Sequence, residues 1–320
     1  MRLFSIILLC LMALPAQGSH SEEGYFAFPA QGQLTGEMVA YYQENGFVVL
    51  TDYLSLSDCD RLLQYGSGLA HALNPSAADL KEQFENRPVY LARSAIGQIP
   101  FFYPEAYRDG QLIVAPADAA YVMGNNSAVC DDVLRALTLT SINQTICQSL
   151  GYKEPQVNQS QMNLKSAVYS QPFLAHQDQM FSPTLNFPLC TFMMPFSTTT
   201  PQNGCLKVIP GSHKNGSRMG FLRQPDNSFA YLNPQGEIIP PAIVTEIRKE
   251  WQAQLSRDLA VPAGSLILLH GNTIHGNTAA EKGFPGNYRV NYSFSLTEQG
   301  DQNPRCWNYN PDYPLIKNAE

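Results

Sequence analysis

A histidine and an aspartate two residues apart, His176 and Asp178, could bind one metal ion. In a β-strand, residues i and i+2 lie on the same face, so this imidazole and this carboxylate could point at a single ion. A distant second histidine would complete a facial triad, which leaves open positions on Fe(II) for a co-substrate and O2. The pair alone is a weak signal, because the rest of the chain must supply the third ligand and a co-substrate anchor.

The third ligand is to be sought among the other histidines. His275 follows the apolar run 266–269 and a short turn, where a strand end could direct it inward. His270 lies five residues earlier and competes for the same role. His213, in a Gly-Ser-His turn, is expected to be structural.

An arginine follows the candidate histidine at the start of a strand-like run. Arg289 lies fourteen residues after His275. If its side chain faces the core of a small barrel, it needs a partner, and its guanidinium matches a carboxylate such as the distal one of 2-oxoglutarate. A surface arginine is the alternative that periodicity leaves open. The order of the four residues nevertheless strengthens the hypothesis of an iron and 2-oxoglutarate site.

The composition is that of a soluble globular protein, with 44% hydrophobic and 15% charged residues among 320. The net charge of −7 and the lack of a Lys/Arg cluster argue against nucleic acid or an anionic membrane as the main partner. The many prolines, glycines and aromatic residues favour turns and strands over a helical bundle.

The first residues are typical of a secretory signal. Arg2 precedes an apolar run over 3–14, and Ala16-Gln17-Gly18 would allow cleavage before Ser19. We therefore expect a signal peptide over 1–18, an exported, secretory-pathway or periplasmic location, and no transmembrane span in the mature chain. The protein would be cytoplasmic if the start is misassigned. Six cysteines would remain, an even number that fits an oxidising compartment but leaves the pairing open.

The first half predicts a helical layer over residues 34–150. Its expected elements are a helix over 35–44 with Thr35 as N-cap and Gly46 just past its end, a strand over 47–50, a helix from about 55 to 73, and a helix over 131–150. Residues 74–128 are expected to form loops and short strands.

The second half, from about 159 to 300, predicts the core of the domain. Short strand-like runs separated by turns are expected at 161–169, 188–196, 204–209, 265–269 and 288–296. Such strands favour a double-stranded β-helix, a jelly roll of the cupin-like kind, with a helix inserted within 240–259. The expected fold is therefore mainly β with flanking helices.

Several motifs resemble the phytanoyl-CoA dioxygenase family of Fe(II)/2-oxoglutarate oxygenases. The most specific is NGCLKVIPGSH at 203–213, and the segments 34–55 and 262–275 are also similar to that family. Together they span roughly 34–296. The resemblance implies a single oxygenase domain over 19–320, with metal ligands and a 2-oxoglutarate anchor at these positions: His176, Asp178, His275 and Arg289.

The segment 159–165 is similar to the matching part of ectoine hydroxylases. This similarity implies that Asn163 contacts 2-oxoglutarate, that Phe173 lines its pocket and that Gln159 faces the substrate. Thr191 would offer a further hydroxyl to the co-substrate. The chain departs from the ectoine pattern at Gln179 and Ser293, which puts ectoine itself in doubt as the substrate.

The resemblance implies a hydroxylase that consumes 2-oxoglutarate and O2, releases succinate and CO2, and acts on an unactivated C–H bond of a small molecule. Asp178 argues against halogenation, because that variant of the reaction has a small residue at this position to admit a halide. A non-catalytic jelly roll that binds a metal or ligand is the alternative. The sequence leaves the substrate and the oligomeric state open. The loops at 74–128 and 214–260, which would define the substrate, carry no recognisable pattern.

Overall fold

The computed structural model describes residues 23–85 and 99–306. Its largest sheet has eight strands: β1 Tyr25–Ala27, β2 Phe47–Thr51, β3 Ile99–Phe102, β6 Ala120–Asn125, β7 Pro155–Ser166, β8 Cys190–Pro195, β14 Leu266–His270 and β16 Tyr288–Glu298. Their order is β1-β2-β14-β8-β16-β7-β6-β3, and every pair except β1–β2 is antiparallel. The expected signal peptide lies outside the described residues.

A smaller sheet packs against one end of the large one. It consists of β13 Arg257–Leu259, β9 Leu206–Val208 and β15 His275–Asn277. Side chains of both sheets form a shared apolar cluster, to which Val208 and Leu259 contribute from the small sheet and Val49 and Ile267 from the large one. Two facing sheets of this kind make a double-stranded β-helix, so the expected fold class is confirmed.

Alternation along the strands of the large sheet divides its residues between two environments. From Gln159 onward in β7, and along β8 and β16, even-numbered apolar residues such as Met162, Phe192 and Phe294 belong to the main hydrophobic core, and a register shift places Val157 with them. Phe192 and Phe294 stack with ring centroids 4.8 Å apart. The odd-numbered residues face the opposite side, where the pocket lies.

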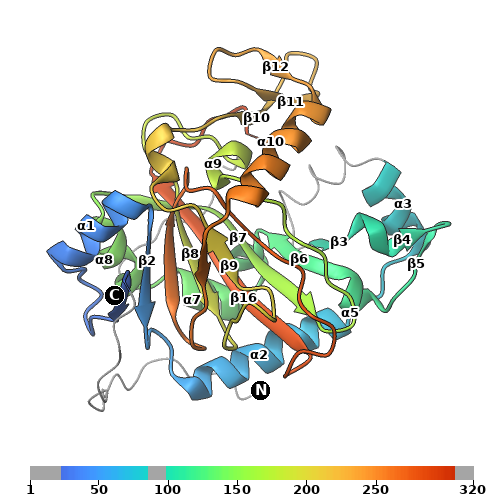
Figure 1. The fold of residues 1–320 in the computed structure, drawn as a ribbon, viewed down its shortest axis with the longest axis horizontal. Helices are drawn as coiled ribbons and strands as arrows, with labels where there is room; N and C mark the ends of the chain where they lie inside the picture. Colours follow the sequence, from blue (N-terminus) through green and yellow to red (C-terminus); the bar gives the residue numbers. More distant parts are fainter. Residues whose placement is uncertain (1–22, 86–98, 307–320) are drawn as a thin grey trace.

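Helices cover the core face of the large sheet (Figure 1). In chain order the helices are α1 Gly36–Asn45, α2 Leu56–His71, α3 Ala77–Glu85, η1 Pro104–Ala106, α5 Pro116–Ala119, α6 Ser127–Cys130, α7 Asp132–Thr138, α8 Ser141–Ser149, α9 Asp178–Phe181, η2 Ser212–Asn215 and α10 Pro241–Gln254. Members of α1, α2, α7 and α8 contribute to the core that the even-numbered strand residues form. None of the helices in the described ranges combines the length and the hydropathy that a bilayer crossing requires.

The capping residues correctly predicted where the first two helices, α1 and α2, begin and where α1 ends. The Thr35 hydroxyl accepts a hydrogen bond from the backbone N–H of Met38, and Gly46 ends α1 in the left-handed region at φ 79°. Ser55 caps α2 in the same way through the N–H of Asp58. The expectations for these helices and for the strand between them are confirmed.

Two expectations were wrong in detail, and a third was right but incomplete. The predicted helix over 131–150 is two helices, α7 and α8, because Thr140 adopts extended backbone and caps the second one. The stretch 74–128 contains α3 and the six-residue strand β6 of the large sheet besides its loops. The helix expected within 240–259 is present as α10, but a three-stranded sheet that was not foreseen precedes it: β10 Gly220–Arg223, β11 Phe229–Leu232 and β12 Ile238–Ile239. A two-stranded ribbon completes the fold: β4 Tyr107–Arg108 and β5 Gln111–Leu112.

The six cysteines of the described chain carry no disulfide bond. Five of them are buried, and Cys130 is exposed. Their side chains therefore contribute to the fold as small apolar groups.

Gly46 permits the turn that joins α1 to β2, and its replacement tests this packing. A Cβ at this position would collide with the Thr273 hydroxyl and the His213 ring, and the backbone is left-handed. We expect Gly46→Ala to lower the free energy of unfolding by about 2 kcal/mol or more. Chemical denaturation would measure this change.

Gly36→Ala is the matched control, because Gly36 lies in the first turn of α1 with open space around its Cβ position. That variant should be as stable as the parent or more stable by up to about 1 kcal/mol. Equal destabilisation by both substitutions would contradict the account given for Gly46.

Candidate metal centre

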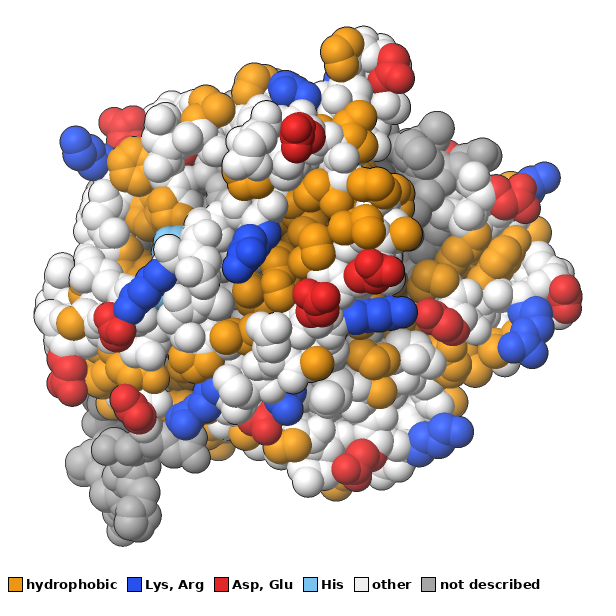
Figure 2. Space-filling model, turned by 45° about the horizontal axis from the view of Figure 1, so that its top comes forward, with side chains coloured by type: hydrophobic (Ala, Val, Ile, Leu, Met, Phe, Trp, Pro, Cys, Tyr) orange, Lys and Arg blue, Asp and Glu red, His pale blue; other side chains and the backbone are white. Residues whose placement is uncertain are grey.

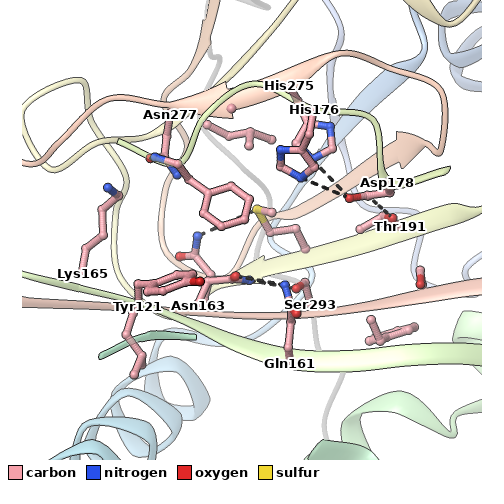
Figure 3. Close-up of a pocket in the computed structure, with 18 of the residues that line it drawn as sticks. Tyr121, Gln161, Asn163, Lys165, His176, Asp178, Thr191, His275, Asn277 and Ser293 are labelled. Atoms are coloured by element: carbon pink, nitrogen blue, oxygen red, sulfur yellow. Dashed lines mark hydrogen bonds and ion pairs between the residues drawn. The ribbon is translucent and has the colours of Figure 1, made fainter. Parts of the chain in front are cut away.

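The pocket lies on the face of the large sheet that the helices leave open, over β7, β16 and β8 (Figure 3). Strand register arranges its floor in rows: Lys165 beside Arg289, Asn163 beside Asn291, Gln161 beside Ser293 and Met193, and Gln159 beside Ser295 and Thr191. The floor is thus polar and uncharged, except for the two cations at one end.

Aromatic side chains form one wall of the pocket. Tyr103 and Tyr121 stack with ring centroids 4.8 Å apart, and Phe173 lies 5.9 Å from Tyr121. Phe173 also meets the His176 ring edge-on at 4.8 Å. This wall leads directly to the cluster of candidate metal ligands.

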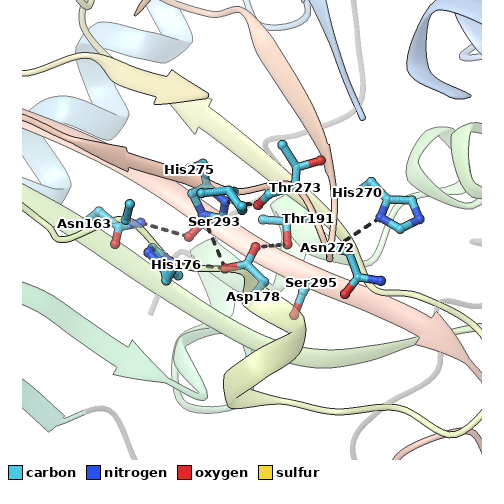
Figure 4. A network of polar contacts seen from close by, with 12 residues as sticks. Asn163, His176, Asp178, Thr191, His270, Asn272, Thr273, His275, Ser293 and Ser295 are labelled. Carbon is cyan, nitrogen blue, oxygen red and sulfur yellow. Dashed lines mark hydrogen bonds and ion pairs between the residues drawn. The ribbon is translucent and has the colours of Figure 1, made fainter. Parts of the chain in front are cut away.

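His176, Asp178 and His275 converge at the pocket (Figure 4). Each offers one ligand atom, and these atoms all lie within 4.8 Å of one another. The Nε2 atoms of both histidines lie 3.5 Å from Oδ1 of Asp178. Two imidazole nitrogens and one carboxylate oxygen form the donor set of a facial triad.

Backbone contacts bring the two histidines together. His176 and His275 form an isolated antiparallel bridge, with N–H···O=C hydrogen bonds of 2.8 and 2.9 Å in the two directions. His275 opens β15, while Asp178 begins the short helix α9 that follows His176. The ligands therefore come from two segments about a hundred residues apart in sequence.

Carbonyl groups fix the orientation of both imidazoles. Nδ1 of His176 lies 3.0 Å from the Leu174 carbonyl oxygen, and Nδ1 of His275 lies 2.9 Å from that of Thr273. A carbonyl only accepts, so each Nδ1 must carry the proton and donate. In the neutral ring, Nε2 then presents its lone pair to the site, as a metal ligand must.

Thr191 orients the carboxylate. Its hydroxyl donates a 2.5 Å hydrogen bond to Oδ2 of Asp178, which leaves Oδ1 directed at the two imidazoles. The expectation for Thr191 was a contact with the co-substrate. The structure shows its hydroxyl bonded to the candidate metal ligand, a position from which outer-shell donors tune a metal site.

The site favours one negative carboxylate beside an unprotonated His176. Burial by itself raises the pKa of Asp178, but the neighbouring His275 and His176 outweigh it and hold that pKa below its usual range. Burial, together with His275, lowers the pKa of His176 to about 4. Burial also opposes protonation of His275, but the Asp178 carboxylate prevails and raises the pKa of that imidazole. The unprotonated His176 is thus ready to act as a ligand.

Arg289 is buried at the cationic end of the floor. Its side chain has 3% of its surface exposed, and Nη1 donates to the Gly204 carbonyl at 2.6 Å. Its Nε has no hydrogen-bond partner in the described chain. The alternative of a surface arginine is therefore wrong, and a buried donor faces the pocket without an acceptor.

The other predicted residues also line the pocket. The Asn163 amide donates to the Ser293 hydroxyl at 2.9 Å and accepts from Gln161 at 3.2 Å. Gln159 and Phe173 are half-buried at its edge. Ser293, noted as a departure from the ectoine pattern, is thus part of the floor beside Asn163.

His270, which competes for the third ligand position, and His213, which was expected to be structural, both lie away from the centre. His270 ends β14 and accepts a hydrogen bond from the Asn272 N–H at Nδ1, and its ring packs 4.8 Å from that of His213 (Figure 4). His213 Nε2 donates to the Gln43 carbonyl at 2.9 Å. Geometry therefore selects His275 over His270.

The glutamines that flank Asp178 connect loops. Gln177 donates to the carbonyls of Gly216 and Asn272 and accepts from the Arg218 N–H. Gln179 accepts from the Leu189 N–H at 2.9 Å. Gln179 departs from the ectoine pattern, and its side chain bonds to Thr184 and Leu189 and does not line the pocket.

The inserted helix α10 is anchored to the segment that carries His176. Arg248 donates to the carbonyls of Leu174 and Ala175 at 2.8 and 3.1 Å. Gln252 accepts from the Ala175 N–H at 2.8 Å and donates to the Asn277 carbonyl at 3.2 Å. Through these bonds α10 supports both histidine segments, and Leu174 is the same carbonyl that orients His176.

Lys165, Asn291 and Arg248 are among the pocket or support residues that the sequence did not predict, as are Tyr121 and Gln161. A signal existed for Asn291, because it lies two residues after Arg289 on one strand and must share its face. Lys165 could have been identified in the same way from its spacing to Asn163. Nothing local distinguishes Arg248 from other charges of a surface helix.

On the face shown in Figure 2, acidic and basic side chains are interspersed around a central group of hydrophobic ones. No continuous basic area appears on this face.

Comparisons with known proteins support the resemblance seen in the sequence. A family model described as phytanoyl-CoA dioxygenase (PhyH) matches residues 42–281. Phytanoyl-CoA dioxygenase 1 of Oryza sativa subsp. japonica is 28% identical over 254 residues, covering 77% of this chain and 84% of the rice protein. Phytanoyl-CoA dioxygenase domain-containing protein 1 of Rattus norvegicus is 28% identical over 280 residues, covering 83% of this chain and 90% of the rat protein.

A solved structure, EctD from S. alaskensis with bound Fe, shares the fold. It aligns with a TM-score of 0.54 at 16% identity, covering 86% of this chain and 80% of EctD. At this sequence identity, the likeness shows a shared fold and nothing more.

Thr191 offers a test of the outer shell of the candidate metal site. Thr191→Val keeps the shape of the side chain and removes the hydroxyl that holds Asp178. We expect the affinity for Co(II) or Zn(II) to fall by about tenfold or more, measured by competition with a chelating dye. Thr191→Ser, which keeps the hydroxyl, should retain the affinity of the parent protein. A loss of 2-oxoglutarate binding with unchanged metal affinity would support the earlier expectation for Thr191 instead.

Proposed function

This chain belongs to the phytanoyl-CoA dioxygenase (PhyH) family, and from this premise we propose that it is an Fe(II)- and 2-oxoglutarate-dependent oxygenase that hydroxylates a small molecule. The observation that carries the proposal is the convergence of His176, Asp178 and His275 at the edge of a polar pocket that also contains Arg289. These three residues would hold the ion, and the pocket beside them would admit the co-substrate.

The donor set fits Fe(II). Both imidazoles have Nδ1 committed to a carbonyl, so two Nε2 lone pairs and Oδ1 of Asp178 are the atoms that face the site. Nitrogen and carboxylate ligands of this number suit non-haem iron oxygenases. When bound, the iron would supply the oxidising chemistry by which 2-oxoglutarate and O2 give succinate, CO2 and a hydroxylated product.

Arg289 would hold the co-substrate at the end distant from the metal. Its unpartnered Nε needs an acceptor, and the distal carboxylate of 2-oxoglutarate offers two oxygens. Asn291 and Asn163 occupy the next row of the floor, between Arg289 and the metal ligands. Their amides would lie beneath the carbon chain of the co-substrate and orient its keto acid toward the metal.

The substrate would lie beyond the metal ligands, against Gln159, Gln161 and the aromatic wall of Tyr121 and Phe173. The amides offer donors and acceptors to a polar substrate, while the rings exclude water from the reacting C–H bond. Asp178 fills the position that a halide would need, so the expected outcome is a hydroxyl group.

The first test removes the carboxylate ligand. We expect the protein with Fe(II), 2-oxoglutarate and O2 to form succinate, and Asp178→Ala to reduce this rate to background because one ligand is lost. Asp226→Ala, which alters an exposed carboxylate in the β10–β11 turn, should keep the rate of the parent protein. Succinate would be measured by chromatography. Activity unchanged in Asp178→Ala would refute the ligand assignment, and a parent protein that binds neither metal nor 2-oxoglutarate would refute the proposal.

The second test removes the anchor. Arg289→Met should raise the Kd for 2-oxoglutarate by about thirtyfold or more, because a buried charge pair with the distal carboxylate is lost. Binding would be measured by calorimetry on the metal-loaded protein. The comparison ligand is 2-oxobutyrate, which lacks that carboxylate and should bind the parent and variant proteins equally. An equal loss of affinity for both ligands would show that Arg289 only maintains the structure of the pocket.

A further inference from the structure

A second cation lies opposite the anchor arginine. Lys165 on β7 is the cross-strand neighbour of Arg289 on β16, and each has only 3% of its surface exposed. The Lys165 ammonium donates to the Ser170 hydroxyl at 3.2 Å and to the carbonyls of Gln171 and Thr278 at 3.0 and 2.9 Å. All three acceptors are neutral, so they satisfy its N–H groups without cancelling its charge.

Gly204 lies between the two cations. Its carbonyl accepts from Arg289, and a Cβ placed on it would come within 3.1 Å of Cε of Lys165. The lysine stem therefore lies next to the residue whose carbonyl accepts from the guanidinium. In the described chain, neither cation forms an ion pair with a carboxylate.

Two buried like charges without a counter-charge are unfavourable, because each has lost its hydration and repels the other. An anion that enters the pocket would relieve both costs. The distal carboxylate expected at Arg289 is such an anion, and the β7–β16 register keeps it near Lys165.

We propose that Lys165 is a second cation of the co-substrate site, which attracts the distal carboxylate through space, and that co-substrate binding is therefore coupled to protonation of Lys165. This inference rests on the proposed function. Lys165 would not replace Arg289 as the direct contact, because its own three donors remain on protein oxygens.

The pKa values of the surrounding groups agree with this role. Burial, and then the charge of Arg289, lower the pKa of Lys165 to about 7. The same pocket raises the pKa of Tyr103 to about 12 and that of Cys205 to about 11, mainly by burial. Burial lowers the pKa of Arg289 only to about 10. Of these four groups, Lys165 alone changes its charge near neutral pH.

Other charged or phenolic groups occur on the segments that pack around Lys165. They are Tyr169, Asp118, Asp258 and Glu281. Asp118 bonds to Ser166, on the opposite face of β7, and Asp258 is paired with Lys207 at 3.3 Å. Glu281 is exposed. None of these carboxylates forms an ion pair with Lys165.

Co-substrate binding and protonation of Lys165 should favour each other. A carboxylate near Lys165 favours its charged form and raises its pKa, so the protein should take up protons when 2-oxoglutarate binds near and above pH 7. Affinity should be highest where Lys165 is already charged, at pH below about 7. It should fall as the pH rises through this value and level off above the pKa of the complex.

Calorimetry on the Co(II)-loaded full chain would test the coupling without enzyme activity. 2-Oxoglutarate would be titrated at about pH 6.5, 7.5 and 8.5, each in two buffers of different ionisation enthalpy. We expect proton uptake at about pH 7.5 and a decrease in affinity of about tenfold between the lowest and highest pH. The control ligand 2-oxobutyrate, which lacks the distal carboxylate, should show neither effect.

Two variants isolate the contribution of Lys165. Lys165→Met should bind 2-oxoglutarate weakly and with little dependence on pH, whereas Lys165→Arg, which stays charged, should lose the proton uptake. Binding by the parent protein without proton uptake, or an equal pH dependence in Lys165→Met, would overturn the role of Lys165 alone. Absence of 2-oxoglutarate binding at every pH, with the metal bound, would overturn the proposed function itself. The proton uptake of the parent protein decides the question even if a variant fails to fold.

Discussion

The pair of backbone hydrogen bonds between His176 and His275 determines where the candidate metal centre lies, since it fixes the separation of two segments that are far apart in sequence. The imidazole centroids lie 4.3 Å apart as a result. The carbonyls of Leu174 and Thr273 then orient the rings through Nδ1. The ligand geometry thus depends mostly on main-chain groups, which are held more rigidly than side chains.

The same strands build the core and the pocket. From Gln159 onward in β7, and along β8 and β16, even-numbered apolar residues pack under the helices, while odd-numbered neighbours form the mostly polar floor of the pocket. A floor of this kind costs stability unless its groups are paired, and Arg289 Nε and Asn291 Oδ1 have no partner in the described chain. The pocket therefore keeps unsatisfied polar groups where a ligand would complete them. Such local departures from good packing are expected at functional sites.

Helix α10 shows how an insertion can become part of a site. Val244 and Trp251 pack it into a separate hydrophobic cluster with Ala175 and Ile274, next to both histidine segments. Arg248 and Gln252 add hydrogen bonds to the main chain of these segments. The helix itself was expected from the sequence, but its contacts were not, because its position depends on the unforeseen sheet β10–β12 that precedes it.

The sequence by itself determined the caps at Thr35 and Gly46, the strand periodicity that defines the two faces, the order of the candidate site residues, and the motifs that identified the family. These features depend on neighbours within a few residues or on a repeated pattern, so they can be read locally. Only the tertiary structure decided that the Thr191 hydroxyl donates to Asp178 and that Lys165 lies beside Arg289. Those contacts depend on the register between strands that pair across long stretches of chain, and that register is set by non-local packing.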